Sequence, residues 1–119
     1  MKIAVTSQGK SFDSPVDPRF GRARYFLIVD TETGEREALD NTQSLNAMQG
    51  AGIQAAETVC RAGVSALLTG HCGPKAFRAL AAGGVKIYVD VDGTVQEAVE
   101  NFKINGYEPA ASPDVEGHW

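Results

Sequence analysis

The fold class follows from residues 64–84, VSALLTGHCGPKAFRALAAGG. The first six of these residues form a largely apolar run, which is typical of a parallel strand with both faces covered. Pro74 suits the first position of a helix, where its missing N–H group leaves no hydrogen bond unmade. We therefore predict a strand over Val64–Thr69 and a helix over Pro74–Ala82 that ends at the following two glycines. A strand followed closely by a helix indicates an α/β protein.

The same alternation extends to both sides of this stretch. We predict a preceding helix over Ile53–Ala62 and a following strand over Val85–Val89. Thr94 and Glu97 have the spacing of a capping box, in which each side chain bonds the backbone N–H group of the other residue. They predict a last helix over Val95–Ile104. The second half of the chain thus contains two strand–helix units.

The first half of the chain has strand patterns joined by loops. We predict strands over Lys2–Ser7, Arg24–Asp30 and Arg36–Leu39. The second of these is apolar on both faces, which suits a central position, whereas the charges of the third suit an edge. Because crossovers between parallel strands are right-handed, we expect the order 3-2-1-4-5 with strand 2 antiparallel. The fold prediction is an α/β single domain with a five-stranded mixed sheet and helices on both faces.

This topology also predicts where a site lies. Residues 1–107 are expected to form the one domain, and residues 108–119 a loosely ordered C-terminal tail. The strand order changes direction between strands 1 and 4, and ligands of open α/β sheets bind at such a switch point. Ser7, at the end of strand 1, would meet residues 70–73 there. Arg22 and Arg24, at the start of strand 2, would reach the same crevice.

Composition narrows the function classes. The chain has 119 residues, a net charge of −4 and two cysteines. An acidic chain lacks the broad basic face of a protein that binds nucleic acid or anionic membranes. The N-terminal apolar stretch is too short for a signal peptide, and two cysteines are too few for a disulfide framework. We therefore expect a cytoplasmic protein that binds neither nucleic acid nor membrane.

Three of the chain's six arginines fall within six residues of the segment 17–26, DPRFGRARYF. We call residues 17–24 the arginine loop. The guanidinium groups of Arg19, Arg22 and Arg24 are planar and carry several N–H donors each, so a bent loop that displays them suits an anion. The alternative is a solvated basic loop whose arginines pair with nearby aspartates, namely Asp13, Asp17 or Asp30.

A second candidate site lies between the fourth predicted strand and the helix that follows it. The N-terminus of that helix would direct the backbone N–H groups of Gly73 and Lys75 toward an anion. Cys72 is placed to be a thiolate or a soft metal ligand, with His71 beside it and Met48 as a further thioether donor. The alternative is that Cys72 is a small, half-buried residue in a tight turn.

The cysteines also allow an enzyme class to be weighed. Cys60 is expected in the core, which leaves no set of four zinc or iron–sulfur ligands in the chain. His71, Cys72 and Arg78 match the spacing of the cysteine-dependent phosphatases, which need a thiolate nucleophile and an arginine on the phosphate. Pro74 removes one of the backbone donors that this chemistry uses. A phosphatase is therefore an alternative to a binding protein.

Taken in order, the motifs resemble the nitrogenase iron–molybdenum cofactor biosynthesis family. The matching segments are residues 1–7, 17–26, 50–56 (GAGIQAA), 69–77 and 84–88. The resemblance implies a ribonuclease H-like fold and the binding of a preassembled molybdenum- or iron-containing sulfide cluster, which is passed on without a reaction of the protein's own. For a stand-alone member of this length it also implies a molybdenum–copper sulfide cluster held non-covalently.

The sequence thus predicts a non-catalytic carrier of an anionic metal–sulfide cluster or thiomolybdate, taken from a donor protein and passed to an acceptor. The residues expected to hold the cluster are Ser7, Arg19, Arg22, Arg24, Gly73 and Lys75, with metal contacts from Cys72, His71 or Met48. We expect a monomer or a weak homodimer. The remaining alternative is a regulatory module whose arginine loop binds an acidic protein partner.

Overall fold

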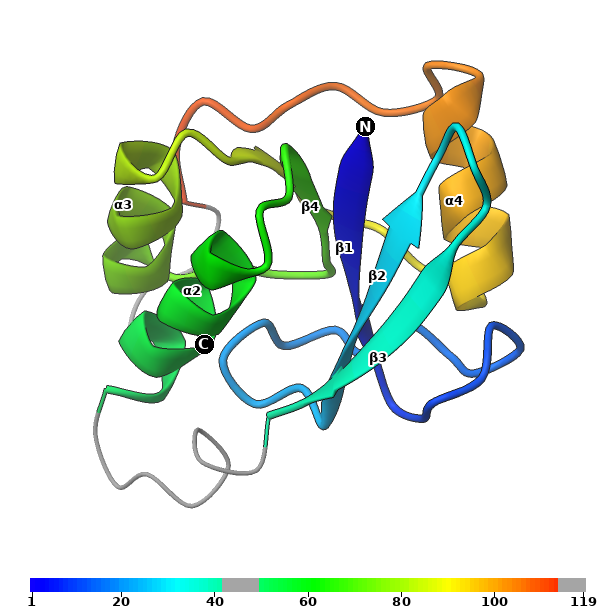
Figure 1. Ribbon diagram of the computed structural model, residues 1–119. Helices are drawn as coiled ribbons and strands as arrows, with labels where there is room; N and C mark the ends of the chain where they lie inside the picture. Colours follow the sequence, from blue (N-terminus) through cyan, green and yellow to red (C-terminus); the bar gives the residue numbers. More distant parts are fainter. Residues whose placement is uncertain (42–49, 114–119) are drawn as a thin grey trace.

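The computed structural model of the chain describes residues 1–41 and 50–113 (Figure 1). Five strands and three helices lie in these two ranges. In chain order they are β1 (Lys2–Ser7), β2 (Tyr25–Asp30), β3 (Arg36–Asp40), α2 (Ala51–Arg61), β4 (Ala66–Leu68), α3 (Pro74–Ala82), β5 (Lys86–Tyr88) and α4 (Val95–Lys103). Every element predicted from the sequence is present, and β1 and α3 have the predicted bounds.

The strands form one mixed sheet in the order β3-β2-β1-β4-β5. β1 is antiparallel to β2 and parallel to β4, so Val5 lies between Leu27 and Leu68. β3 is the antiparallel edge strand beside β2, and β5 is the parallel edge strand beside β4. The predicted strand order, the antiparallel second strand and the edge position of the third strand are confirmed.

Helices cover both faces of the sheet, as predicted (Figure 1). α2 and α3 pack on one face, where Val59 and Leu80 join Leu67 in a buried apolar cluster. α4 packs on the other face, where Val95 joins Val5 in a second cluster. Each fully buried side chain of this kind stabilises the fold by roughly 1.5–3 kcal/mol relative to an exposed one. No helix within the described ranges is long and apolar enough to cross a bilayer.

Six elements differ from their predicted bounds, and β2, β3 and α4 do so by a single residue. β4 and β5 are shorter than their apolar runs, although Val64 and Val85 just before them are buried. The apolar run therefore marks the buried residues, of which only the central ones pair as a strand. α2 begins at Ala51, two residues before its predicted start. Gly50 precedes it at φ 75°, in the left-handed region that glycine adopts without strain, and turns the chain into the helix early.

The segment after α4 returns toward the β5 edge of the sheet. The N–H group of Ala110 donates a hydrogen bond to the carbonyl oxygen of Ile87 at 2.7 Å. This bond lies beyond residue 107, within the segment expected to be loosely ordered. The loose order of residues 108–119 as a whole stays a prediction.

Candidate functional site

The site begins where β1 and β4 end side by side. Thr6 is the last residue but one of β1, and Thr69 directly follows β4. Both side chains are fully buried. The Thr6 hydroxyl donates to the carbonyl oxygen of Asp17 at 2.7 Å and lies 3.0 Å from the Thr69 hydroxyl. The N–H group of Asp17 in turn donates to the carbonyl oxygen of Thr6 at 2.9 Å. These bonds fasten the start of the arginine loop to the switch point of the sheet.

The loop also packs closely on the connection between β4 and α3. The N–H group of Phe20 donates to the carbonyl oxygen of His71 at 3.2 Å, and Arg19 forms an isolated parallel bridge with the same residue. Gly70 makes this approach possible, because a Cβ atom there would lie 2.6 Å from both Cα and the carbonyl oxygen of Pro18. Only a glycine at position 70 lets the two backbones come this close.

Two apolar residues of the loop anchor it in the core. Phe20 and Ala23 are fully buried, and the ring of Phe20 lies 5.5 Å from that of Phe26. The side-chain amide of Asn41 donates a hydrogen bond to the carbonyl oxygen of Ala23 at 2.8 Å. The backbone N–H group of Asn41 donates to the carbonyl oxygen of Arg24 at 3.0 Å. With these residues turned inward, the neighbouring arginines are left at the surface.

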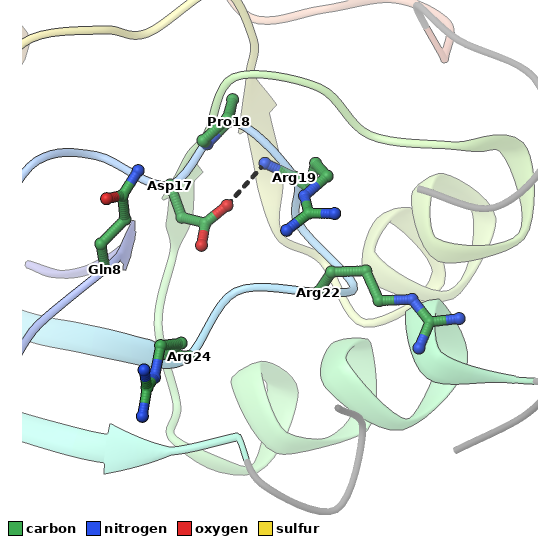
Figure 2. Close-up of a pocket in the computed structure, with 6 residues that line it drawn as sticks. All are labelled: Gln8, Asp17, Pro18, Arg19, Arg22 and Arg24. Carbon is green, nitrogen blue, oxygen red and sulfur yellow. Dashed lines mark hydrogen bonds between the residues drawn. The ribbon is translucent and has the colours of Figure 1, made fainter. Parts of the chain in front are cut away.

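The three arginines of the loop line one open pocket of about 710 Å³. Its lining residues are Gln8, Asp17, Pro18, Arg19, Arg22 and Arg24. Arg19 and Arg24 are exposed and Arg22 is half-buried. Figure 2 shows the three guanidinium groups spread around the pocket, with Arg22 and Arg24 directed to opposite sides. Such a rim of donors suits an anion that is larger than a single small ion and is contacted from several directions. We call this cavity the arginine pocket.

Asp17 places a carboxylate in the wall of this basic pocket. The residue is only 5% exposed, and its Oδ1 accepts a hydrogen bond from the backbone N–H group of Arg19 at 3.0 Å. Burial raises the pKa of Asp17 above its usual value, while the bond from Arg19 and the charge of Arg19 act in the opposite direction. Sequence reasoning considered Asp17 only as a partner for the arginines and missed it as a lining residue.

Other predicted cluster-binding residues lie outside the lining of this pocket. Ser7 is fully buried, and its hydroxyl donates to the carbonyl oxygen of Gly9 at 2.6 Å, whereas its neighbour Gln8 faces the pocket. Gly73 is buried as the N-cap of α3, and Lys75 is exposed on the first turn. A role for these groups in holding a cluster stays a prediction.

The predicted metal contacts are placed less openly than expected. Cys72 is fully buried in the apolar cluster beneath α2 and α3, and its Sγ lies 3.8 Å from the carbonyl oxygen of Gly73. His71 is half-buried beside the arginine loop, and Met48 lies outside the described residues. Within the described part of the chain, no group of three or more His, Cys, Asp or Glu side chains is arranged to hold a metal ion.

The second cysteine, like the first, forms no disulfide. Cys60 on α2 is half-buried rather than fully inside, and it packs against the core cluster where the sequence placed it. Burial raises the pKa of the Cys60 thiol, so it is mostly protonated near neutral pH. Neither cysteine offers an accessible thiolate in this structure.

The fold and the pocket together define a small α/β protein with an arginine-lined pocket at the switch point of its sheet. The family model described as "Dinitrogenase iron-molybdenum cofactor" matches residues 1–105. The chain belongs to this family, which confirms the resemblance seen in the sequence motifs.

Solved structures and a curated relative agree with this assignment. The apo form of the orange protein from Desulfovibrio gigas is 45% identical, with 96% of each chain covered and a TM-score of 0.94. The Thermotoga protein TM1290, described as a candidate NifB protein, is 37% identical, with 98% of each chain covered and a TM-score of 0.84. The uncharacterized protein MJ0580 of Methanocaldococcus jannaschii is 31% identical over 105 residues, covering 86% of this chain and 85% of its own.

Proposed function

We propose that the chain binds and carries an anionic metal–sulfide cluster that contains molybdenum or iron, and that the arginine pocket holds it. The observation that carries this proposal is the placement of Arg19, Arg22 and Arg24 around one open pocket at the switch point of the sheet. Membership of the iron–molybdenum cofactor family supports the kind of cargo. A molybdenum–copper sulfide cluster, which the sequence resemblance implies, is one such anion.

The chemistry of the pocket favours holding over reaction. Guanidinium groups and the amide of Gln8 donate hydrogen bonds to sulfide or oxygen atoms at the surface of a cluster without replacing any of its bonds. An anion held in this way can leave intact, which a carrier between a donor and an acceptor protein requires. Metal ligation by His71 or Met48 would add a soft contact, but the proposal does not depend on it.

The two alternatives from the sequence have less support. A cysteine-dependent phosphatase needs an accessible thiolate, whereas Cys72 is fully buried and Arg78 is exposed along α3. A regulatory module that binds an acidic partner through the arginine loop would use the same charges. It differs from the carrier in one observable property, because the protein purified from its host would have no chromophore.

The test is the visible spectrum and the metal content of protein purified from its native host without oxygen. We expect a sulfide-to-metal charge-transfer band together with molybdenum or iron. The double variant Arg22→Gln/Arg24→Gln should be purified without the band, because it loses two cations of the pocket. The matched control Arg61→Gln/Arg78→Gln removes the same charge from exposed positions on α2 and α3 and should keep it. Colourless, metal-free wild-type protein would contradict the proposal.

A further inference from the structure

The arginine pocket contains one group that repels the ligand the pocket is proposed to bind. The carboxylate of Asp17 lies in its wall, 5% exposed, among the three arginines. One carboxylate oxygen accepts a hydrogen bond from the backbone N–H group of Arg19. In Figure 2 the other oxygen points into the space between Gln8 and Arg24. An ionised carboxylate only accepts hydrogen bonds, so this oxygen offers nothing to an anion whose surface atoms are all acceptors.

The position of Asp17 is fixed by the fold. Its carbonyl oxygen accepts the Thr6 hydroxyl, and its N–H group donates to the carbonyl oxygen of Thr6. Pro18 follows directly and is packed against Gly70. With backbone bonds on one side and a tight backbone contact on the other, the side chain cannot withdraw from the pocket by a movement of the loop. A bound anion must therefore accommodate the carboxylate.

We propose that Asp17 determines which anions the arginine pocket accepts. It favours an anion that presents a hydrogen-bond donor, such as a protonated sulfide or a hydroxyl group, over a fully deprotonated anion of the same shape and charge. This inference rests on the proposed function and deepens it, because it names the class of cluster surface that the pocket takes. A donor on the anion satisfies the free oxygen of Asp17 while the arginines neutralise the remaining charge.

The same arrangement couples the binding of a deprotonated anion to the protonation of Asp17. Such an anion raises the pKa of Asp17 further, because two negative charges then share one site. Between the pKa values of the free and the occupied protein, binding takes up a proton from solvent onto Asp17. Affinity then falls as pH rises, by up to about tenfold per pH unit for one linked proton.

Other charged groups face Asp17 and have to be separated from it in a test. Arg19, Arg22 and Arg24 come from its own loop and line the same pocket. From the connection between β4 and α3, His71 is bridged to Arg19 through the backbone. A variant of each titratable group therefore belongs in the experiment.

The test uses tetrathiomolybdate, a fully deprotonated dianion, as the probe. Its affinity is measured as a function of pH, and proton uptake is measured by calorimetry in two buffers of different ionisation enthalpy. Asp17→Asn keeps the shape of the side chain and an oxygen for the Arg19 N–H group. We expect Asp17→Asn to bind more tightly than wild type, by up to about tenfold at the highest pH, and to lack the proton uptake at every pH where wild type shows it.

Asp13→Asn is the matched control, because it removes an aspartate charge from an exposed position outside the pocket lining. It should behave as wild type. If Asp17→Asn takes up the same proton and binds no more tightly than Asp13→Asn, or if only His71→Gln abolishes the uptake, the inference is wrong while the proposed function stands. If neither wild type nor Asp17→Asn binds tetrathiomolybdate at any pH, the proposed function fails and the inference fails with it.

Discussion

Replacing Gly70 by alanine tests whether the close packing of the arginine loop builds the pocket. A Cβ atom at residue 70 would lie 2.6 Å from both Cα and the carbonyl oxygen of Pro18. Ordinary contact begins near 3.4 Å, so the loop has to retreat by about 0.8 Å. Both contacted atoms belong to the backbone, and no side-chain rotation relieves the clash. The retreat moves the adjacent pocket residues Asp17 and Arg19 together with Pro18.

Both the stability of the fold and the affinity for the anion are expected to fall. The shift strains the 3.2 Å bond from the N–H group of Phe20 to His71, and overpacking of this kind costs roughly 1–3 kcal/mol. Displacing pocket donors by nearly an ångström is expected to weaken tetrathiomolybdate binding on the order of tenfold to a hundredfold. Urea unfolding gives the free energy of unfolding, and an absorbance titration with tetrathiomolybdate gives the affinity.

Gly84→Ala is the control for stability without the clash. Gly84 has φ 79° and no heavy atom within 4 Å of a built Cβ, so alanine there costs only backbone strain of roughly 1–2 kcal/mol. It lies after α3, outside the pocket lining. We expect a similar loss of stability and unchanged anion affinity. The reasoning is refuted if Gly70→Ala binds tetrathiomolybdate as tightly as Gly84→Ala does.

Three further outcomes are expected. Thr94→Ala should lower the free energy of unfolding by roughly 1 kcal/mol in urea, because it removes the capping box with Glu97, and an unchanged value would contradict that role. Because burial raises the pKa of Asp17, the charged form costs stability as pH rises from the unfolded pKa through the folded one. The free energy of unfolding of Asp17→Asn, taken relative to that of wild type, should therefore increase over that pH range. A difference that does not change with pH would contradict the raised pKa of Asp17. A thiol reagent should leave Cys72 unmodified in the folded protein and react slowly with half-buried Cys60, and mass spectra that show Cys72 labelled first would disprove its burial.

Most of the fold could be predicted because its signals are local. The Thr94 and Glu97 capping box, Pro74 at a helix start and the apolar faces of β2 depend on residues close in sequence. The strand order then follows from the handedness of crossovers. The start of α2 was missed, because the left-handed conformation of Gly50 is a property of the folded backbone.

The gathering of the three arginines could be predicted, because a loop that connects β1 to β2 must lie near the switch point. The details of the site depend on contacts between residues distant in the chain, which no spacing reveals. Asn41 caps the loop from beyond β3, and Thr6 fastens it from β1. Cys72 is buried because the arginine loop and its Phe20 ring join the same cluster. An acidic residue directly before an arginine-rich segment was the one sequence signal for Asp17.

The central claim is that the positive charge of the arginine pocket holds the anion. The most direct measurement is the tetrathiomolybdate affinity of wild type and of Arg22→Gln/Arg24→Gln at about 0.05 M and about 0.5 M salt, over which the screening length falls from roughly 14 Å to roughly 4 Å. We predict that wild type loses at least about tenfold in affinity, and that the double variant binds weakly with little dependence on salt. Equal affinity of the two proteins at both salt concentrations would contradict the claim.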